Sequence, residues 1–264
     1  MREFKDRNEW ALILGGSSGL GLATAKKLAQ HGLNICIVHR NPRLQQEAIT
    51  REFEFIKQNG IQFKSFNCDA FKPEKRAEVI NEFKLLLRDT DKIKTLVHSV
   101  AKGNLKPMVS DQNIELKNDD FALTIQAMGI SLYDWFKSLF DANLFSKDAR
   151  IISFTSEGNS KAWQNYAAVS AAKVTLEAIT RNIALEFALH GIKANCIQAG
   201  VTDTASLRLI PGSDEIINRS EKRNPNKRLT TPEDVANVVY LLIKDEASWI
   251  TGSIIPVDGG EHLS

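Results

Sequence analysis

A tyrosine and a lysine that could handle a proton lie close together in the stretch NYAAVSAAKVTLEA, residues 165–178. Tyr166 and Lys173 are seven positions apart, which is nearly two turns of an α-helix. A phenol can donate a proton or a hydrogen bond to a developing oxyanion, and a nearby ammonium group lowers its pKa from about 10. Taken alone, such a tyrosine is more often a packing residue and such a lysine is more often solvated.

Val169 lies between these two residues on the same predicted helical face, because positions 166, 169 and 173 are spaced i, i+3 and i+7. A valine side chain has no proton to give. In a continuous helix, Tyr166 lies one turn before Val169, a shift of about 4.5 Å at roughly 1.5 Å per residue. The stretch resembles the pair that many oxidoreductases carry only four positions apart, and the position four before Lys173 is Val169. The resemblance implies either a site that has lost its proton donor or a site whose donor serves a more distant oxygen.

Seven short apolar runs alternate with longer amphipathic segments, and this alternation predicts the scaffold that holds these groups. The expected strands are 10–15, 34–39, 61–68, 93–99, 149–156, 192–200 and 252–260. Alternation of this kind favours right-handed crossovers and a sheet covered by helices on both faces. We expect one α/β domain over residues 1–264, doubly wound, with a seven-stranded, mostly parallel sheet.

The segment 201–229, after the sixth expected strand, contains Pro, Gly and many charged residues and reads as a loop-rich region. Ligands of open α/β sheets bind at the carboxyl ends of the strands, so this segment is a candidate substrate lid. The alternative is a surface excursion without a function.

The composition is that of an ordinary globular domain. Of 264 residues, 43% are hydrophobic and 25% are charged, and the net charge of +2 gives no reason to expect nucleic acid or a membrane surface as a partner. Cys36, Cys68 and Cys196 show no disulfide or zinc spacing, and no His, Asp or Glu cluster suggests a metal. The sequence begins without an apolar signal core and has no run near the roughly 20 apolar residues of a membrane span, so we expect a cytoplasmic protein.

A glycine-rich turn follows the first expected strand in the stretch LILGGSSGLGLATAKKLAQHG. Gly15, Gly19 and Gly21 allow a tight turn and a close approach of the backbone to a ligand. The free N–H groups at the start of the next helix would bind a pyrophosphate. The strand before this turn and the helix after it make the pattern typical of a dinucleotide site.

The end of the second expected strand, VHRNPR at 38–43, indicates which dinucleotide binds. An acidic residue at this place would bind the ribose hydroxyls of NAD. Arg40 and Arg43 stand there instead, and a guanidinium group pairs well with a 2′-phosphate. We therefore predict NADPH rather than NADH, with two solvated surface arginines as the alternative.

The glycine spacing GxxxGxG resembles that of the short-chain dehydrogenase/reductase superfamily, although Leu14 stands where that family usually has threonine. The segment HSVA at 98–101 and the spacing YxxxxxxK of Tyr166 and Lys173 resemble the enoyl-acyl-carrier-protein reductases of this superfamily. The stretch RIISFTSEGNS places Ser156 on the family's catalytic serine. The resemblance covers essentially the whole chain and implies a single-domain Rossmann fold.

By this resemblance, Tyr166, Lys173 and Ser156 are the catalytic residues, and Lys173 also binds the nicotinamide ribose. Asp69, in the segment CDAF, would lie near the adenine amine, and Gln126 stands where the family usually has a structural asparagine. The other residues that the resemblance implies in cofactor binding are Gly15, Ser17, Ser18, Gly19, Leu20, Gly21, Arg40, Ala70, Ser99, Val100, Ala101, Gly200, Thr202 and Thr204.

The position of Tyr166 favours reduction of a carbon–carbon double bond. In a ketone, the carbon that accepts the hydride carries the oxygen that needs the proton, so the donor must lie close to the hydride path. In an enoyl thioester, hydride attacks the β-carbon, and the negative charge develops on the thioester oxygen, further along the substrate. A tyrosine set back by one turn suits the second case, and the small Val169 side chain leaves room.

We therefore expect an NADPH-dependent enoyl-acyl-carrier-protein reductase of fatty acid biosynthesis. The alternatives are a carbonyl or 3-ketoacyl reductase and a non-catalytic dinucleotide-binding protein. The substrate would be an enoyl thioester on acyl-carrier protein or on coenzyme A, and basic residues such as Arg208 could meet the acidic helix of the carrier. The segments 122–140 and 171–191 resemble the helices that form the family's homotetramer.

Overall fold

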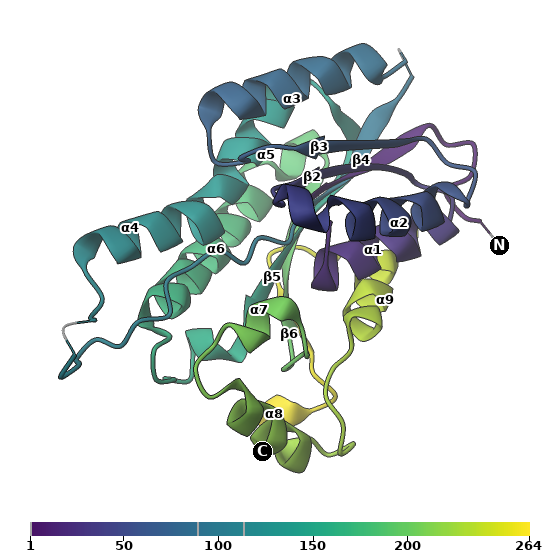
Figure 1. The fold of residues 1–264 in the computed structure, drawn as a ribbon. Coiled ribbons are helices and arrows are strands. Elements are labelled where there is room, and N and C mark those ends of the chain that lie inside the picture. Colours follow the sequence, from purple (N-terminus) through teal and green to yellow (C-terminus); the bar gives the residue numbers. More distant parts are fainter. Residues whose placement is uncertain (1, 89, 113) are drawn as a thin grey trace.

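The computed structural model describes residues 2–88, 90–112 and 114–264 (Figure 1). The strands are β1 (Glu9–Leu14), β2 (Asn34–His39), β3 (Phe63–Asn67), β4 (Lys92–His98), β5 (Phe145–Ser156), β6 (Ile192–Ala199) and β7 (Ile254–Val257). They form one sheet in the order β3-β2-β1-β4-β5-β6-β7, and all six neighbouring pairs are parallel. The predicted doubly wound α/β fold with seven strands is confirmed.

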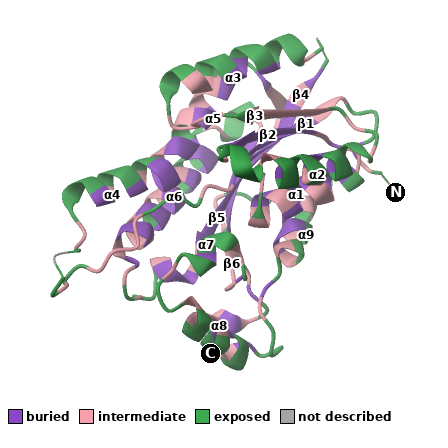
Figure 2. Ribbon diagram, in the orientation of Figure 1, coloured by how far each residue is buried: buried purple, intermediate pink, exposed green. Residues whose placement is uncertain are grey.

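Helices cover both faces of the sheet because each face carries its own set of apolar side chains. One face packs against α3 (Pro73–Leu86), α5 (Ser131–Asp141) and α6 (Ala167–Glu186). The other face packs against α1 (Gly19–Gln30), α2 (Gln46–Lys57) and α9 (Pro232–Ile243). Figure 2 shows the central strands buried between these two layers. This double burial explains why the strands are continuous apolar runs in the sequence.

The segment 122–140, which we expected to be helical, is divided between three helical elements. It contains the end of α4 (Asn118–Ile125), a π-helical turn over Gln126–Ile130 and most of α5. Gly129 lies in this turn, where a Cβ atom would be 3.0 Å from the Thr175 side chain and 3.1 Å from the Ala172 carbonyl oxygen. The absence of a side chain therefore lets this turn pack closely against α6.

The segment 201–229 is more ordered than a loop-rich region. It contains α7 (Ala205–Arg208) and α8 (Ser213–Arg223), with a turn at Gly212 between them. Gly212 has a φ of +76°, a conformation that favours glycine. Figure 1 shows both helices beyond the end of β6, over the carboxyl edge of the sheet.

The order of the strands reverses between β1 and β4, which lie side by side although β2 and β3 separate them in the sequence. In open α/β sheets, ligands bind outside the carboxyl ends of the strands at such a reversal. The glycine turn follows β1, and the segment HSVA begins at His98, the last residue of β4. Ser156 ends β5. The topology thus brings the predicted site residues to one edge of the sheet.

Candidate active site

The turn between β1 and α1 forms the first part of the site. Gly15 has a φ of +83°, and a Cβ atom there would lie 2.1 Å from the Ser99 carbonyl oxygen, so both the conformation and the space require glycine. Ser18 is the N-cap of α1, and the first N–H groups of this helix are free to bind an anion. Gly21 has a packing role, because a Cβ atom there would lie 2.3 Å from the Gly15 carbonyl oxygen.

A cleft of about 730 Å³ runs along this edge of the sheet. The residues predicted to bind the cofactor that line it are Gly15, Ser17, Ser18, Gly19, Leu20, Arg40, Ala70, Ser99, Val100, Ala101, Lys173 and Thr204. Gly21, Asp69, Gly200 and Thr202 do not line it, and the last two line a neighbouring pocket. Because the glycine turn and the first residues of α1 line the cleft, the residues present fit a dinucleotide.

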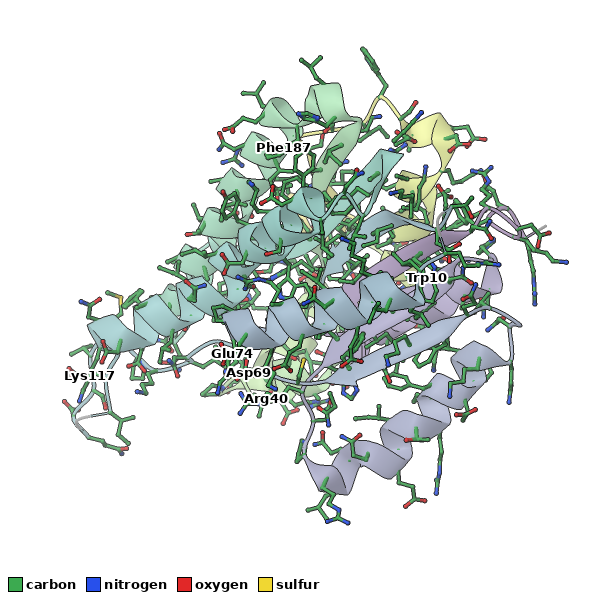
Figure 3. The ribbon with its side chains drawn as sticks, turned by 90° about the horizontal axis from the view of Figure 1, so that it is seen from above. Trp10, Arg40, Asp69, Glu74, Lys117 and Phe187 are labelled. Carbon is green, nitrogen blue, oxygen red and sulfur yellow. The ribbon has the colours of Figure 1, made fainter. Side chains whose placement is uncertain are left out.

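Arg40 and Asp69, which the sequence predicts to bind different parts of the cofactor, bind each other in the structure. The Arg40 guanidinium donates a hydrogen bond of 2.7 Å to the Asp69 carboxylate. Figure 3 shows the two residues side by side. The Arg40 side chain is still 62% exposed and lines the cleft, whereas Arg43 is an exposed residue outside the cleft lining. A phosphate that binds here would compete with Asp69 for Arg40.

Asn41 also lines this end of the cleft, and the sequence reasoning missed it. Its Oδ1 atom accepts a hydrogen bond from the Ser17 hydroxyl at 2.8 Å and lies 2.8 Å from Nδ1 of His39. Burial lowers the pKa of His39, although the hydrogen bond with Asn41 acts in the opposite sense. The Asn67 side chain bonds to both the N–H and the carbonyl of Asn41. Asn41 thus joins the glycine turn to the ends of β2 and β3.

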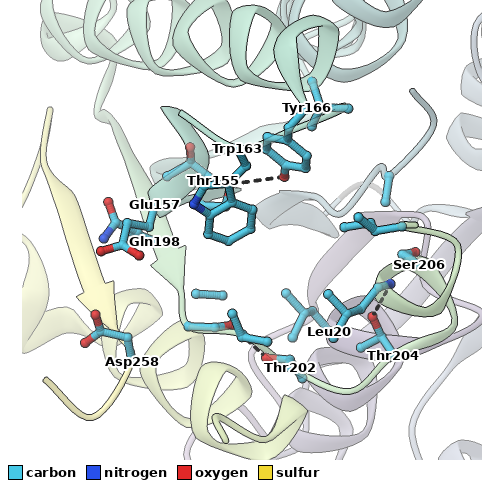
Figure 4. A pocket seen from close by; sticks show the side chains of 18 of the residues that line it. Leu20, Thr155, Glu157, Trp163, Tyr166, Gln198, Thr202, Thr204, Ser206 and Asp258 are labelled. Atoms are coloured by element: carbon cyan, nitrogen blue, oxygen red, sulfur yellow. Dashed lines mark hydrogen bonds between the residues drawn. The ribbon is translucent and has the colours of Figure 1, made fainter. Parts of the chain in front are cut away.

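A second pocket, of about 230 Å³, adjoins the cleft and shares Leu20, Ala101, Thr155, Thr204 and Ser206 with it. Its apolar lining includes Leu105, Met128, Trp163, Val169, Val201, Leu207, Leu209 and Ile210. Figure 4 shows the polar side chains of Glu157, Gln198 and Asp258 on the side of the pocket opposite Leu20 and Thr204. The sequence reasoning did not find most of this lining, because it comes from loops and helices far apart in the chain.

The Tyr166 hydroxyl lies in this second pocket, 3.2 Å from the Ser156 hydroxyl oxygen (Figure 4). The prediction that Tyr166 lies within the helix is wrong by one residue, since Tyr166 is the N-cap and α6 begins at Ala167. The residue before it, Asn165, has a φ of +61°, so the chain turns sharply into the helix. The Tyr166 carbonyl still accepts a hydrogen bond from the Ser170 N–H at 2.8 Å.

Burial raises the pKa of Tyr166, and the hydrogen bond with Ser156 acts in the opposite sense. The expectation that Lys173 lowers this pKa is therefore wrong. Lys173 lines the cleft of about 730 Å³, called the cofactor cleft below, and does not line the second pocket, which contains Tyr166. The Lys173 Nζ atom donates a hydrogen bond of 2.6 Å to the Phe154 carbonyl oxygen. Burial lowers the pKa of Lys173 to about 8, which Cys196 and Glu177 partly oppose.

His98 is buried at the edge of the sheet that carries the site, whereas Gln126 is exposed and lines neither cavity. His98 is buried at the end of β4, with Nε2 2.7 Å from the Ser131 hydroxyl, and burial and Lys173 lower its pKa to about 3. It therefore carries no charge near neutral pH, as a structural histidine would. Gln126 is exposed and donates a hydrogen bond to Asp134, away from both cavities.

The segment over the pocket is held by local polar contacts. Thr204 is the N-cap of α7, and its hydroxyl oxygen accepts a hydrogen bond from the Leu207 N–H at 3.2 Å. Arg208 forms ion pairs with Asp203 at 2.7 Å and with Asp214 at 2.5 Å. The charge of Arg208 is thus already compensated within this segment, which weakens the expectation that it meets an acidic carrier.

Two further properties concern the described residues 2–88, 90–112 and 114–264 as a whole. No group of three or more His, Cys, Asp or Glu side chains among them could hold a metal ion. No helix within these ranges has the length and apolar character needed to cross a membrane.

Comparisons with known proteins identify the family. Residues 15–262 match the family model of enoyl-(acyl carrier protein) reductase. Over 98% of the chain and 99% of the relative's length, the sequence is 28% identical to the enoyl-acyl-carrier-protein reductase (NADH) FabI of Enterococcus faecalis. It is 29% identical to the NADPH form, FabI of Staphylococcus aureus, over 97% of both chains.

Similarity extends beyond the enoyl reductases. The chain is 29% identical to the 7alpha-hydroxysteroid dehydrogenase of Paraclostridium sordellii, over 98% of this chain and 94% of that one. Among solved structures, the Bacillus cereus enoyl-acyl carrier protein reductase with NADP+ and indole naphthyridinone has a TM-score of 0.87 at 23% identity, over 100% of this chain and 99% of the other. The chain is therefore an oxidoreductase-family protein of the short-chain dehydrogenase/reductase superfamily and belongs to its enoyl-(acyl carrier protein) reductase branch.

Proposed function

We propose that this protein is an NADPH-dependent enoyl-acyl-carrier-protein reductase that reduces the trans-2 double bond of enoyl thioesters in fatty acid biosynthesis. The position of the Tyr166 hydroxyl carries the proposal. It lies in an apolar pocket beside the cofactor cleft, 3.2 Å from Ser156, and Val169 lines the same pocket without a proton to give. Membership of the enoyl reductase branch supports the same function.

The residues of the site divide the work between the two cavities. NADPH, when bound, supplies the hydride. Lys173, in the cofactor cleft, would bind the ribose hydroxyls and so orient the nicotinamide. Tyr166, in the adjoining pocket, would donate a hydrogen bond or a proton to the enolate oxygen of the substrate. Because burial raises its pKa, Tyr166 is protonated at neutral pH, as a donor must be.

Ser156 would donate a hydrogen bond to the enolate oxygen of the substrate or would position the Tyr166 hydroxyl. Its hydroxyl can donate to the Tyr166 oxygen or accept from it, so it can hold the phenol in one orientation. The apolar side chains around the pair lower the local polarity, which strengthens electrostatic interactions with a developing oxyanion.

A ketone reductase is the second candidate, and the similarity to a hydroxysteroid dehydrogenase favours it. This reaction needs the proton donor close to the carbon that accepts the hydride. Val169 lies one helical turn nearer to Lys173 than Tyr166 does and cannot donate. A ketone substrate would therefore have to reach Tyr166 from an unusual position.

A direct assay separates the two candidates and a non-catalytic protein. The protein is mixed with NADPH and either crotonyl or longer trans-2-enoyl thioesters or acetoacetyl thioester, and the loss of nicotinamide absorbance is followed. We expect enoyl turnover, reduced about 10²- to 10⁴-fold in Tyr166→Phe, which is the usual contribution of a general acid. Turnover of the ketone alone would establish the second candidate. Tight NADPH binding with no turnover would indicate a binding protein.

We further propose that acyl-carrier protein delivers the substrate, that the segment 201–229 acts as a lid and that the chain forms a homotetramer. The lid proposal is supported by the pocket lining, since Leu207, Leu209 and Ile210 all belong to this segment. Equal Michaelis constants for carrier-protein and coenzyme A thioesters would argue against the carrier. Sedimentation of the purified protein would establish its oligomeric state.

A further inference from the structure

Three successive residues at the end of β5 each hold one polar side chain of the α6 segment. The Phe154 carbonyl accepts a hydrogen bond from Lys173 at 2.6 Å, and the Ser156 hydroxyl lies 3.2 Å from that of Tyr166. Between them, the Thr155 hydroxyl donates a hydrogen bond of 2.5 Å to the Glu177 carboxylate. Two of these three contacts involve residues to which the proposed reaction already assigns a role. The contact with Glu177 does not.

Glu177 is a buried acidic residue with specific partners. Glu177 is only 6% exposed. Its Oε1 atom accepts hydrogen bonds from both the Thr155 hydroxyl and the Asn159 side-chain amide. A carboxylate in such surroundings is costly unless hydrogen bonds compensate for the lost water. Asn159 lies in the 3₁₀ turn Glu157–Asn159 that follows Ser156. Glu177 therefore connects α6 to the strand end and the turn on either side of Ser156.

Glu177 also lies one helical turn from Lys173 on α6, a spacing at which side chains interact. Three titratable groups interact electrostatically with Lys173, namely Glu177, His98 on β4 and Cys196 on β6. His98 is uncharged near neutral pH because its pKa is about 3, and burial raises the pKa of the Cys196 thiol, so that it too is uncharged. Of these three groups, Glu177 supplies the negative charge that opposes the burial of the Lys173 ammonium.

We propose that Glu177 is a positioning residue that keeps Lys173 cationic in the cofactor cleft and holds the turn after Ser156. The proposal deepens the proposed function, because it rests on Lys173 binding the cofactor. It does not depend on which substrate is reduced. Thr155, which lines both cavities, is the link through which Glu177 contacts the site.

The test separates the charge of Glu177 from its hydrogen bonds. Glu177→Gln keeps a carbonyl oxygen that can accept from Thr155 and Asn159 but removes the charge. The matched control is Glu186→Gln, the same substitution at an exposed position of the same helix. The dissociation constant for NADPH, measured by nicotinamide fluorescence without substrate, is followed against pH for both variants and for the unmodified protein.

We expect NADPH affinity to fall as the pH rises and Lys173 loses its proton. In Glu177→Gln the midpoint of this loss moves to lower pH by about one unit, the smaller end of the effect of a neighbouring opposite charge. Glu186→Gln leaves the midpoint in place. An unchanged midpoint in Glu177→Gln, in a variant that melts like the unmodified protein, would overturn the proposal.

A second variant covers the case in which Glu177→Gln does not fold. Glu177→Ala removes both the charge and the acceptor, so we expect a lower melting temperature together with the shifted midpoint. A lower melting temperature with an unchanged midpoint means that Glu177 is only structural, and the proposal then fails. If the midpoint shifts but the unmodified protein reduces no enoyl thioester, the proposed function fails and the role of Glu177 stands.

Discussion

We expect the choice between NADPH and NADH to depend on Arg40, and Arg40→Asp is the substitution that tests this prediction. The Arg40 side chain lines the cofactor cleft, and its one ion-pair partner among the described residues is Asp69, at 2.7 Å. In Arg40→Asp, the 2′-phosphate of NADPH loses a cation and meets two carboxylates. NADH has no 2′-phosphate, so its binding is affected much less.

The size of the effect follows from the exposure of Arg40 and from its existing partner. A hydrogen bond to a charged group contributes about 1.5–3 kcal/mol. The side chain is 62% exposed and must give up or share Asp69 to bind a phosphate, so the lower end applies. About 1.5 kcal/mol corresponds to a factor of about ten in affinity. We therefore expect the NADPH Michaelis constant to rise about tenfold, and the ratio of the NADPH to the NADH constant to rise by a similar factor.

The assay measures initial rates against both cofactors at fixed enoyl thioester concentration. Arg43→Asp is the matched control, because Arg43 is exposed, belongs to the same loop and lies outside the cleft lining. Asp69→Asn, which removes the competing carboxylate, should lower the NADPH constant. The reasoning is refuted if Arg40→Asp changes neither constant, changes both equally, or has no more effect than Arg43→Asp.

Two other predictions concern the cofactor cleft. Because the pKa of Lys173 is about 8, its cation is present below that pH, so NADPH affinity should be constant near pH 6–7 and fall about tenfold per unit above about pH 8, as a fluorescence titration over pH would show. A pH-independent affinity up to pH 10 would contradict the assigned role of Lys173. Gly15→Ala should abolish NADPH binding and lower the melting temperature, since a Cβ atom would lie 2.1 Å from the Ser99 carbonyl oxygen. Gly60→Ala is its control: Gly60 has a φ of +68° but no atom within 4 Å of a Cβ, so it should cost only the roughly 1 kcal/mol of an unfavourable backbone conformation.

The strands and the glycine turn were predictable because their signals are local. Strands buried on both faces are runs of apolar residues, and Gly15 reports a backbone conformation that its own neighbours require. The π-helical turn before α5 was not predictable in this way. It depends on how closely Gly129 approaches α6, a contact between segments more than forty residues apart in the sequence.

The site was predictable in its residues but less so in their partners. Tyr166, Ser156 and Lys173 lie around the end of β5, the arrangement that the family resemblance implies. The pKa of Tyr166 is raised, whereas we expected Lys173 to lower it. Burial dominates, and the Lys173 ammonium group donates a hydrogen bond to the Phe154 carbonyl instead. Burial depends on everything that packs around a side chain, so the spacing of two residues cannot reveal it.

The sequence by itself determined the alternation of strands and helices along the chain, the glycine-rich turn after the first strand and the presence of a valine, which has no proton to give, at position 169. These features follow from periodicity, glycine and residue type, which act over a few neighbouring positions. Only the tertiary structure decided that Arg40 is held by Asp69, that Asn41 joins two loops and that Glu177 lies under Thr155. Each of these contacts joins residues from different elements, and only the folding of the sheet and its helices brings them within hydrogen-bond distance.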